Sequence, residues 1–175
     1  GLDMDVSLIQ AKALLGLLEG DKDQDEIICT VAEFASKRLS TWGEGLVRLA
    51  CVANLLPALS GETGYLAIFY ATRQISREAR GAVPHRLRGS LDGDGRDSET
   101  LSRWLDTFVK ARHADGIERT ISTALRNLNK RDSAGLLSDA AAVRLYADGG
   151  HLLDMCNKAY ELIRHIGPEH AESQI

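Results

Sequence analysis

Aromatic residues, β-branched residues and prolines are all scarce in this sequence. Phe, Trp and Tyr make up 5% of the 175 residues, Val and Ile together number 17, and there are three prolines. Leu, by contrast, occurs 25 times and Ala 21 times. Because β-branched and aromatic side chains favour strands while Leu and Ala favour helices, this composition argues against a sheet-rich fold and predicts an all-α protein.

The sequence also lacks a basic excess and a long apolar run. The net charge is −4 and the isoelectric point is about 5.7, so we expect no nucleic-acid partner. The longest apolar stretch, residues 46–59, is interrupted by Arg48, Asn54 and Pro57, so we expect no membrane span. Asp3 and Asp5 stand where a signal peptide would be basic, and we therefore expect a cytoplasmic protein.

Cysteine is rare, and its spacing does not suggest disulfides. Cys29, Cys51 and Cys156 are an odd number, lie far apart and have apolar neighbours in the sequence. We predict that they are small buried hydrophobic residues of a protein in a reducing compartment.

Helical periodicity divides the chain into about eight helices with short connections. Residues 81–97 are the exception, because they hold four glycines and a proline and show no helical period. We predict a single domain, residues 1–175, in which this loop separates two four-helix halves of an antiparallel bundle or a short stack of helical hairpins. The expected helices are 5–18, 21–38, 41–56, 64–79, 98–109, 117–128, 133–145 and 151–166. The residues expected to begin them include Ser40 or Thr41 for 41–56, Ser60 for 64–79, Asp97 or Ser98 for 98–109, Asp115 and Gly116 for 117–128, and Asp132 or Ser133 for 133–145.

Two acidic stretches and one basic run stand out among the charged residues. Residues 21–26 and 92–95 imitate the start of a calcium loop but lack its glycine at position six and its glutamate at position twelve, so we expect no such loop. Arg73, Arg77 and Arg80 share a helix face within a basic run that also includes His85, Arg86 and Arg88. We expect these arginines to pair with the acidic first fifth of the chain.

The C-terminal helix carries the densest set of chemically active side chains. Five polar residues at steps of 3, 4, 3 and 4 form one stripe on it, and imidazole with carboxylate at i and i+3 can hold one metal ion. The alternative is that the stripe binds nothing and is a solvent-exposed helix face. It would then be stabilised by i, i+4 pairs between Asp154 and Lys158 and between Glu161 and His165. The ligand-binding candidates are Gly149, Gly150, His151, Asp154 and Glu161; the metal-ligand candidates are His151, Asp154, His165 and His170.

Three segments carry a resemblance to a known family: GLVRLACVANLLPAL, WLDTFVKARHADGIERTISTAL and DGGHLLDMCNKAYELIRHIGPEHA. Over residues 44–172 the chain resembles an uncharacterised bacterial all-helical family whose longer members carry a Rieske-type [2Fe–2S] domain. That resemblance implies a Trp where Pro168 stands and a His where Ala71 follows Tyr70, so any metal site of the family is incomplete here. No Cys has a His within three residues, and we expect no iron–sulfur cluster on this chain.

These observations leave two hypotheses for function. The first is a soluble helical binding or scaffold domain that forms a homodimer, with a further protein partner of redox or metabolic type implied by the resemblance alone. The alternative is a small enzyme or a protein that binds a ligand or a single metal ion at the helix start formed by Gly149, Gly150 and His151. The sequence holds no nucleophile elbow, phosphate loop or zinc-protease motif, so it does not decide whether the protein is an enzyme.

Overall fold

A computed structural model describes residues 1–20, 22–84, 86–91 and 96–175. The described residues form nine α-helices, three short 3₁₀ segments and no strand, which confirms the all-α prediction. All eight expected helices are present, and the ninth, α9, is a single turn close to the C-terminus. The helices are α1 (Ser7–Glu19), α2 (Gln24–Arg38), α3 (Glu44–Leu55), α4 (Gly61–Glu78), α5 (Ser98–Ala111), α6 (Ala114–Asn127), α7 (Lys130–Ala142), α8 (His151–Ile166) and α9 (Ala171–Gln174).

The chain divides into two compact units, and the boundary falls inside α8. The first unit contains residues 1–85 and 161–174, and the second contains residues 86–160 together with Ile175. The first unit therefore takes α1 to α4 and the C-terminal segment, while the second takes α5 to α7 and the first part of α8. That residues 1–175 fold as one domain stays a prediction.

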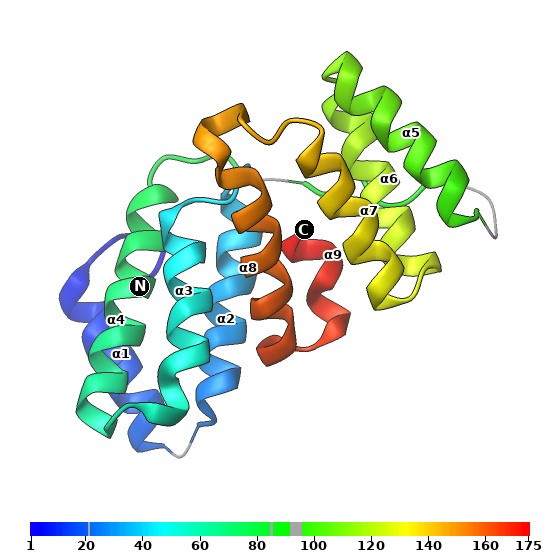
Figure 1. Ribbon diagram of the computed structural model, residues 1–175. Helices are drawn as coiled ribbons and strands as arrows, with labels where there is room; N and C mark the ends of the chain where they lie inside the picture. Colours follow the sequence, from blue (N-terminus) through cyan, green and yellow to red (C-terminus); the bar gives the residue numbers. More distant parts are fainter. Residues whose placement is uncertain (21, 85, 92–95) are drawn as a thin grey trace. The chain divides into compact units, whose positions relative to one another are not determined.

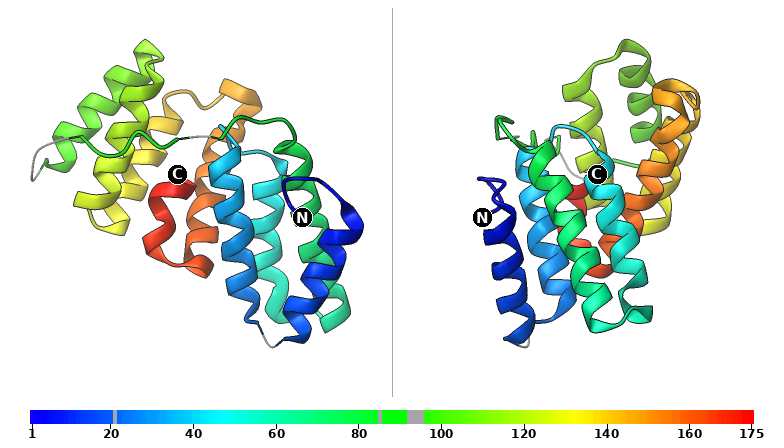
Figure 2. Two further views of the ribbon diagram at one scale, coloured as in Figure 1. Left: turned by 180° about the vertical axis from the view of Figure 1, so that it is seen from behind. Right: turned by 90° about the vertical axis from the view of Figure 1, so that its left-hand side faces the viewer.

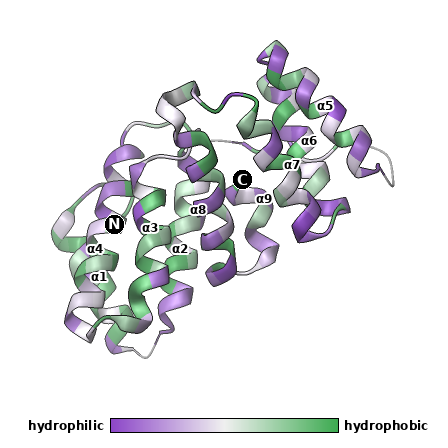
Figure 3. Ribbon diagram, in the orientation of Figure 1, coloured by the Kyte–Doolittle hydropathy of each residue, from purple (hydrophilic) through white to green (hydrophobic). Residues whose placement is uncertain are grey.

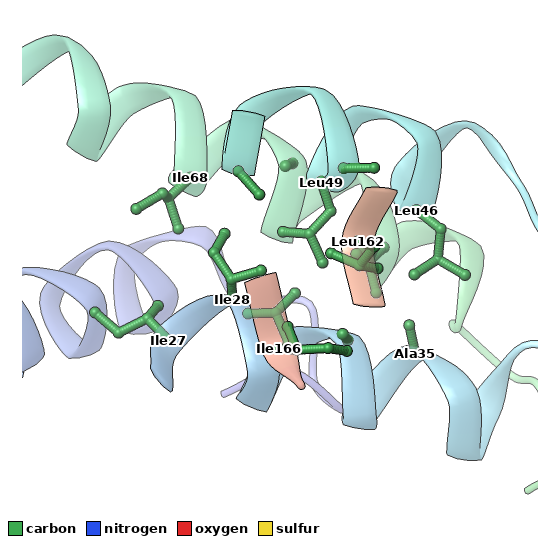
Figure 4. Close-up of a cluster of buried hydrophobic side chains, with 14 of the residues drawn as sticks. Ile27, Ile28, Ala35, Leu46, Leu49, Ile68, Leu162 and Ile166 are labelled. Carbon is green, nitrogen blue, oxygen red and sulfur yellow. The ribbon is translucent and has the colours of Figure 1, made fainter. Parts of the chain in front are cut away.

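In the first unit, α1 to α4 lie side by side (Figure 1), and two further views show the same arrangement (Figure 2). Their inward faces form one apolar core with the C-terminal end of α8, because Leu162 and Ile166 pack among the side chains of α2 and α3 (Figure 4). Ile28, Leu49 and Leu162 have no exposed surface. The end of α8 is thereby fixed against α2.

The second unit has a smaller core between α5, α6 and α7. Leu101 and Leu105 of α5 are buried against Ala124 of α6 and Leu136 of α7. The faces of α5, α6 and α7 that point away from this core carry polar residues. Figure 3 shows hydrophobic and hydrophilic residues on different sides of these helices. The amphipathic pattern used to predict the helices is therefore the pattern that packs them.

The structure confirms some of the predicted N-cap residues and contradicts others. Ser60 and Asp97 cap α4 and α5 as expected, since their side chains accept from the backbone N–H groups of Thr63 and Thr100. The predicted start of α3 was wrong. Ser40 and Thr41 lie in a bend and the helix begins only after Gly43, where the carboxylate of Glu78 on α4 accepts from the N–H of Gly45 at 2.9 Å. The side chains of His113 and Asn129 cap α6 and α7 in place of the later residues expected.

The basic run pairs only partly as predicted. Arg80 forms an ion pair with Asp5 in the acidic N-terminal segment, as expected. Arg88 instead pairs with Asp115 on α6 at 3.3 Å. The predictions for Asp21, His85 and residues 92–95 lie outside the described residues. Across the part of the chain that the structure describes, no helix is long and apolar enough to cross a membrane.

Candidate metal centre

Cys29 and Glu33 lie one turn apart on α2, and the fold brings His170 against them from the other end of the sequence. The helix α8 ends at Ile166, and Gly167 then adopts a φ of 102°, a left-handed conformation that favours glycine. The nearest atoms that a Cβ here would meet belong to the exposed carboxylate of Glu169, which can move aside, so it is the backbone conformation that favours glycine. This turn reverses the chain into the 3₁₀ segment Pro168–His170.

The segment that follows His170 is fastened to the first unit by buried hydrogen bonds. The side-chain amide of Gln174, only 2% exposed, donates to the carbonyl of Ala32 at 3.2 Å. The indole N–H of Trp42 donates to the carbonyl of Gln174 at 2.6 Å. With Ile166 buried before it and Gln174 after it, His170 is held in place from both sides.

One atom from each of Cys29, Glu33 and His170 lies within 4.8 Å of the other two, a spacing that suits a metal ion. The Sγ of Cys29 is 3.5 Å from Nε2 of His170, and Nδ1 of the same ring is 3.3 Å from Oε1 of Glu33. For tetrahedral zinc, with Zn–S near 2.3 Å and Zn–N near 2.0–2.1 Å, sulfur and nitrogen lie about 3.5 Å apart. If Nε2 binds the metal, Glu33 is placed either to join as a ligand or to orient the imidazole through Nδ1.

The pKa of the Cys29 thiol is raised, because the side chain is partly desolvated and the carboxylates of Glu33 and Glu169 lie nearby. Without a cation, Cys29 is therefore a neutral thiol at pH 7. A bound divalent cation reverses this preference for the protonated thiol, because it stabilises the thiolate and neutralises the carboxylates.

This electrostatic arrangement predicts that metal binding releases a proton from Cys29. Because the raised pKa keeps the thiol protonated below neutral pH, the Zn²⁺ affinity should rise about tenfold per pH unit through this one proton. Calorimetric titrations in buffers of different ionisation enthalpy would count the proton. A Zn²⁺ affinity that does not change with pH, within about one unit on either side of neutrality, would contradict a thiolate ligand.

Cys29 and Glu33 line one side of an open depression of about 440 Å³ on the first unit. Four carboxylates face it, and the only lysine on its wall, Lys22, pairs with Glu26 at 2.7 Å. Such an acidic surface concentrates cations and repels anions. The lining residues are Lys22, Asp23, Asp25, Glu26, Cys29, Thr30, Glu33, His165 and Ile166.

The structure separates the residues predicted from the C-terminal stripe into two groups. His165 lines the depression, Glu161 lies one turn before it on α8, and His170 joins the cysteine cluster. His151 and Asp154 belong to the second unit, where both are exposed.

The predicted glycine turn is present at the start of α8. Gly149 and Gly150 have φ values of 67° and 85°, and a Cβ on Gly149 would be 3.5 Å from the ring of His151. The proposed ligand site there stays a prediction.

Cys29 and Glu33 were missed by the sequence analysis, and the prediction of three buried cysteines was wrong. All three are free, as the spacing predicted, but they are only half-buried. The available signal was a Cys and a Glu four residues apart on a predicted helix. It could not be used, because the third residue, His170, lies 141 positions later.

Comparison of the chain with protein-family models, with curated proteins and with solved structures gives no match.

Proposed function

We propose that this protein binds one divalent transition-metal ion of the zinc class through Cys29, Glu33 and His170. The observation that carries the proposal is the close approach of a thiol, an imidazole and a carboxylate on two segments fixed by a common core. Thiolate and imidazole favour Zn²⁺ over Mg²⁺ or Ca²⁺, which take oxygen ligands. Three protein ligands leave a fourth position for water or a ligand that enters from the depression.

The experiment is elemental analysis of tag-free protein purified without a chelator, followed by titration of the metal-free protein with Co²⁺. We expect about one zinc-class ion per chain and a near-ultraviolet thiolate-to-cobalt absorption band that Zn²⁺ abolishes by competition. A protein that takes up no Zn²⁺ and shows no thiolate band would contradict the proposal.

A second candidate function, self-association, is favoured by the surface of α1. Leu8 and Leu15, seven residues apart and so on one face of α1, are 62% and 45% exposed, and the neighbouring Ile9 is 47% exposed. Apolar patches of this kind commonly mark interfaces between proteins. This surface supports the homodimer of the scaffold hypothesis, with a second copy of α1 as its partner.

Lysine substitutions on α1 test the dimer. We expect the parent chain to sediment as a dimer and the variant Leu8→Lys/Leu15→Lys to sediment as a monomer of 19.1 kDa, because a buried interface cannot accept two uncompensated charges. The control is Leu152→Lys, a substitution at a half-exposed leucine of α8. A parent that is monomeric at every concentration tested would rule out the dimer.

A further inference from the structure

The two ring nitrogens of His165 face different partners, of which Asp25 also lines the depression. Nε2 lies 2.9 Å from Oδ1 of Asn54 on α3, and Nδ2 of Asn54 donates to Oε2 of Glu161 at 2.7 Å. Nδ1 faces the carboxylate of Asp25 near the start of α2. Three helices of the first unit thus meet at this imidazole.

The hydrogen bonds of Asn54 favour a proton on Nε2 of His165. An ionised carboxylate only accepts, so Glu161 requires the NH₂ group of Asn54 on its side. The amide oxygen of Asn54 must then face His165, and it accepts from Nε2–H. In the tautomer that has its proton on Nε2 alone, the lone pair lies on Nδ1, which faces Asp25.

Two acceptors therefore oppose each other across the depression. Nδ1 of His165 is 3.7 Å from Oδ1 of Asp25, which is beyond the 2.7–3.2 Å range of a hydrogen bond. Either a proton on Nδ1, which makes the contact an ion pair, or a metal ion between the two atoms stabilises it. Transition-metal ions bind imidazole nitrogen and carboxylate oxygen at about 2.0–2.2 Å, so one ion spans a gap of this size.

We propose that His165 Nδ1 and Asp25 Oδ1 hold a second divalent transition-metal ion, distinct from the ion at Cys29, Glu33 and His170. Water completes the coordination from the open side, and Asn54 and Glu161 act as positioning residues that keep the Nδ1 lone pair directed at the ion. With two protein ligands and no thiolate, this position binds more weakly than the first. It does not depend on occupancy of the first site.

The test is the ¹⁵N spectrum of the histidine side chains of the full chain during a Zn²⁺ titration. In metal-free protein at neutral pH we expect a proton on Nε2 of His165 and a lone pair on Nδ1. As Zn²⁺ is added, the Nδ1 resonance should move to a metal-bound position, and the stoichiometry should reach two ions per chain. The first ion is reported separately by the thiolate band in Co²⁺-substituted protein.

Matched variants separate the two sites. His165→Gln and Asp25→Asn should lower the stoichiometry from two ions to one and leave the thiolate band unchanged, while Cys29→Ser should abolish the band and leave the His165 response intact. The controls His151→Gln and Asp154→Asn, on exposed residues of the same helix, should keep both ions. A His165 resonance that does not move with excess Zn²⁺, or an Nδ1 already protonated without metal, would overturn the second site whether or not the first one binds.

Discussion

Replacing Cys29 by Ser, or His170 by Gln, is expected to lower the Zn²⁺ affinity of the chain by more than about 100-fold. Changing a residue that merely supports a metal ligand costs 10–100-fold in affinity, and removing a ligand itself costs more. Each variant removes one ligand from one of the two segments that form the cluster. The two variants should therefore lose similar amounts of Zn²⁺ affinity. Competition with a chromophoric chelator at pH 7.5, about half a unit above neutrality, measures both constants.

The matched control is Cys156→Ser, because Cys156 is also free and half-buried but lies in the second unit. Its Zn²⁺ affinity should equal that of the parent. Glu169→Gln is a second control: its carboxylate is 4.0 Å from Nε2 of His170 and largely exposed, so only a small change is expected. An affinity that falls equally in Cys29→Ser and Cys156→Ser would place the metal elsewhere.

The substitution Leu162→Ala is expected to destabilise the first unit by about 2–5 kcal/mol, as truncation of a fully buried leucine generally does. Leu162 has no exposed surface and packs in the core with Leu49 and Ile28 (Figure 4). It also anchors the end of α8, from which His165 and His170 extend. The same variant should therefore weaken Zn²⁺ binding although no ligand has changed.

Trp42 fluorescence in a Trp104→Phe background follows the first unit alone, because Trp42 donates to Gln174 in that unit and Trp104 belongs to the second. We expect the urea midpoint to fall in Leu162→Ala with an unchanged slope. The control Leu152→Ala removes a side chain that is 38% exposed and should cost much less. Equal losses in the two variants would mean that the end of α8 does not belong to this core.

The sequence predicted the helices well because their signals are local. Leu and Ala at helical spacing, the glycines and proline of residues 81–97, and the caps at Ser60 and Asp97 all act within a few residues. The start of α3 failed for the opposite reason. The N–H group of Gly45 at this start donates to Glu78, a residue 33 positions later, and no local pattern indicates that partner.

The candidate site was also predicted only where its signals are local in the sequence. His165 and His170 were named because both lie near the end of a helix rich in polar side chains. Their partners Asp25, Cys29 and Glu33 are more than 130 residues earlier. The segments are brought together by the burial of Leu162 and Ile166 in the first core and by the hydrogen bonds of Gln174. The polar stripe on α8 was therefore visible in the sequence, but the ligand set was not.

The most direct test of the account is X-ray absorption spectroscopy at the zinc edge of the protein loaded with one Zn²⁺ per chain. The account predicts one sulfur ligand at about 2.3 Å, with the remaining ligands nitrogen or oxygen at about 2.0–2.2 Å, and it predicts that Cys29→Ser removes the sulfur. A zinc shell of nitrogen and oxygen alone in the parent protein would contradict a metal centre at Cys29, Glu33 and His170.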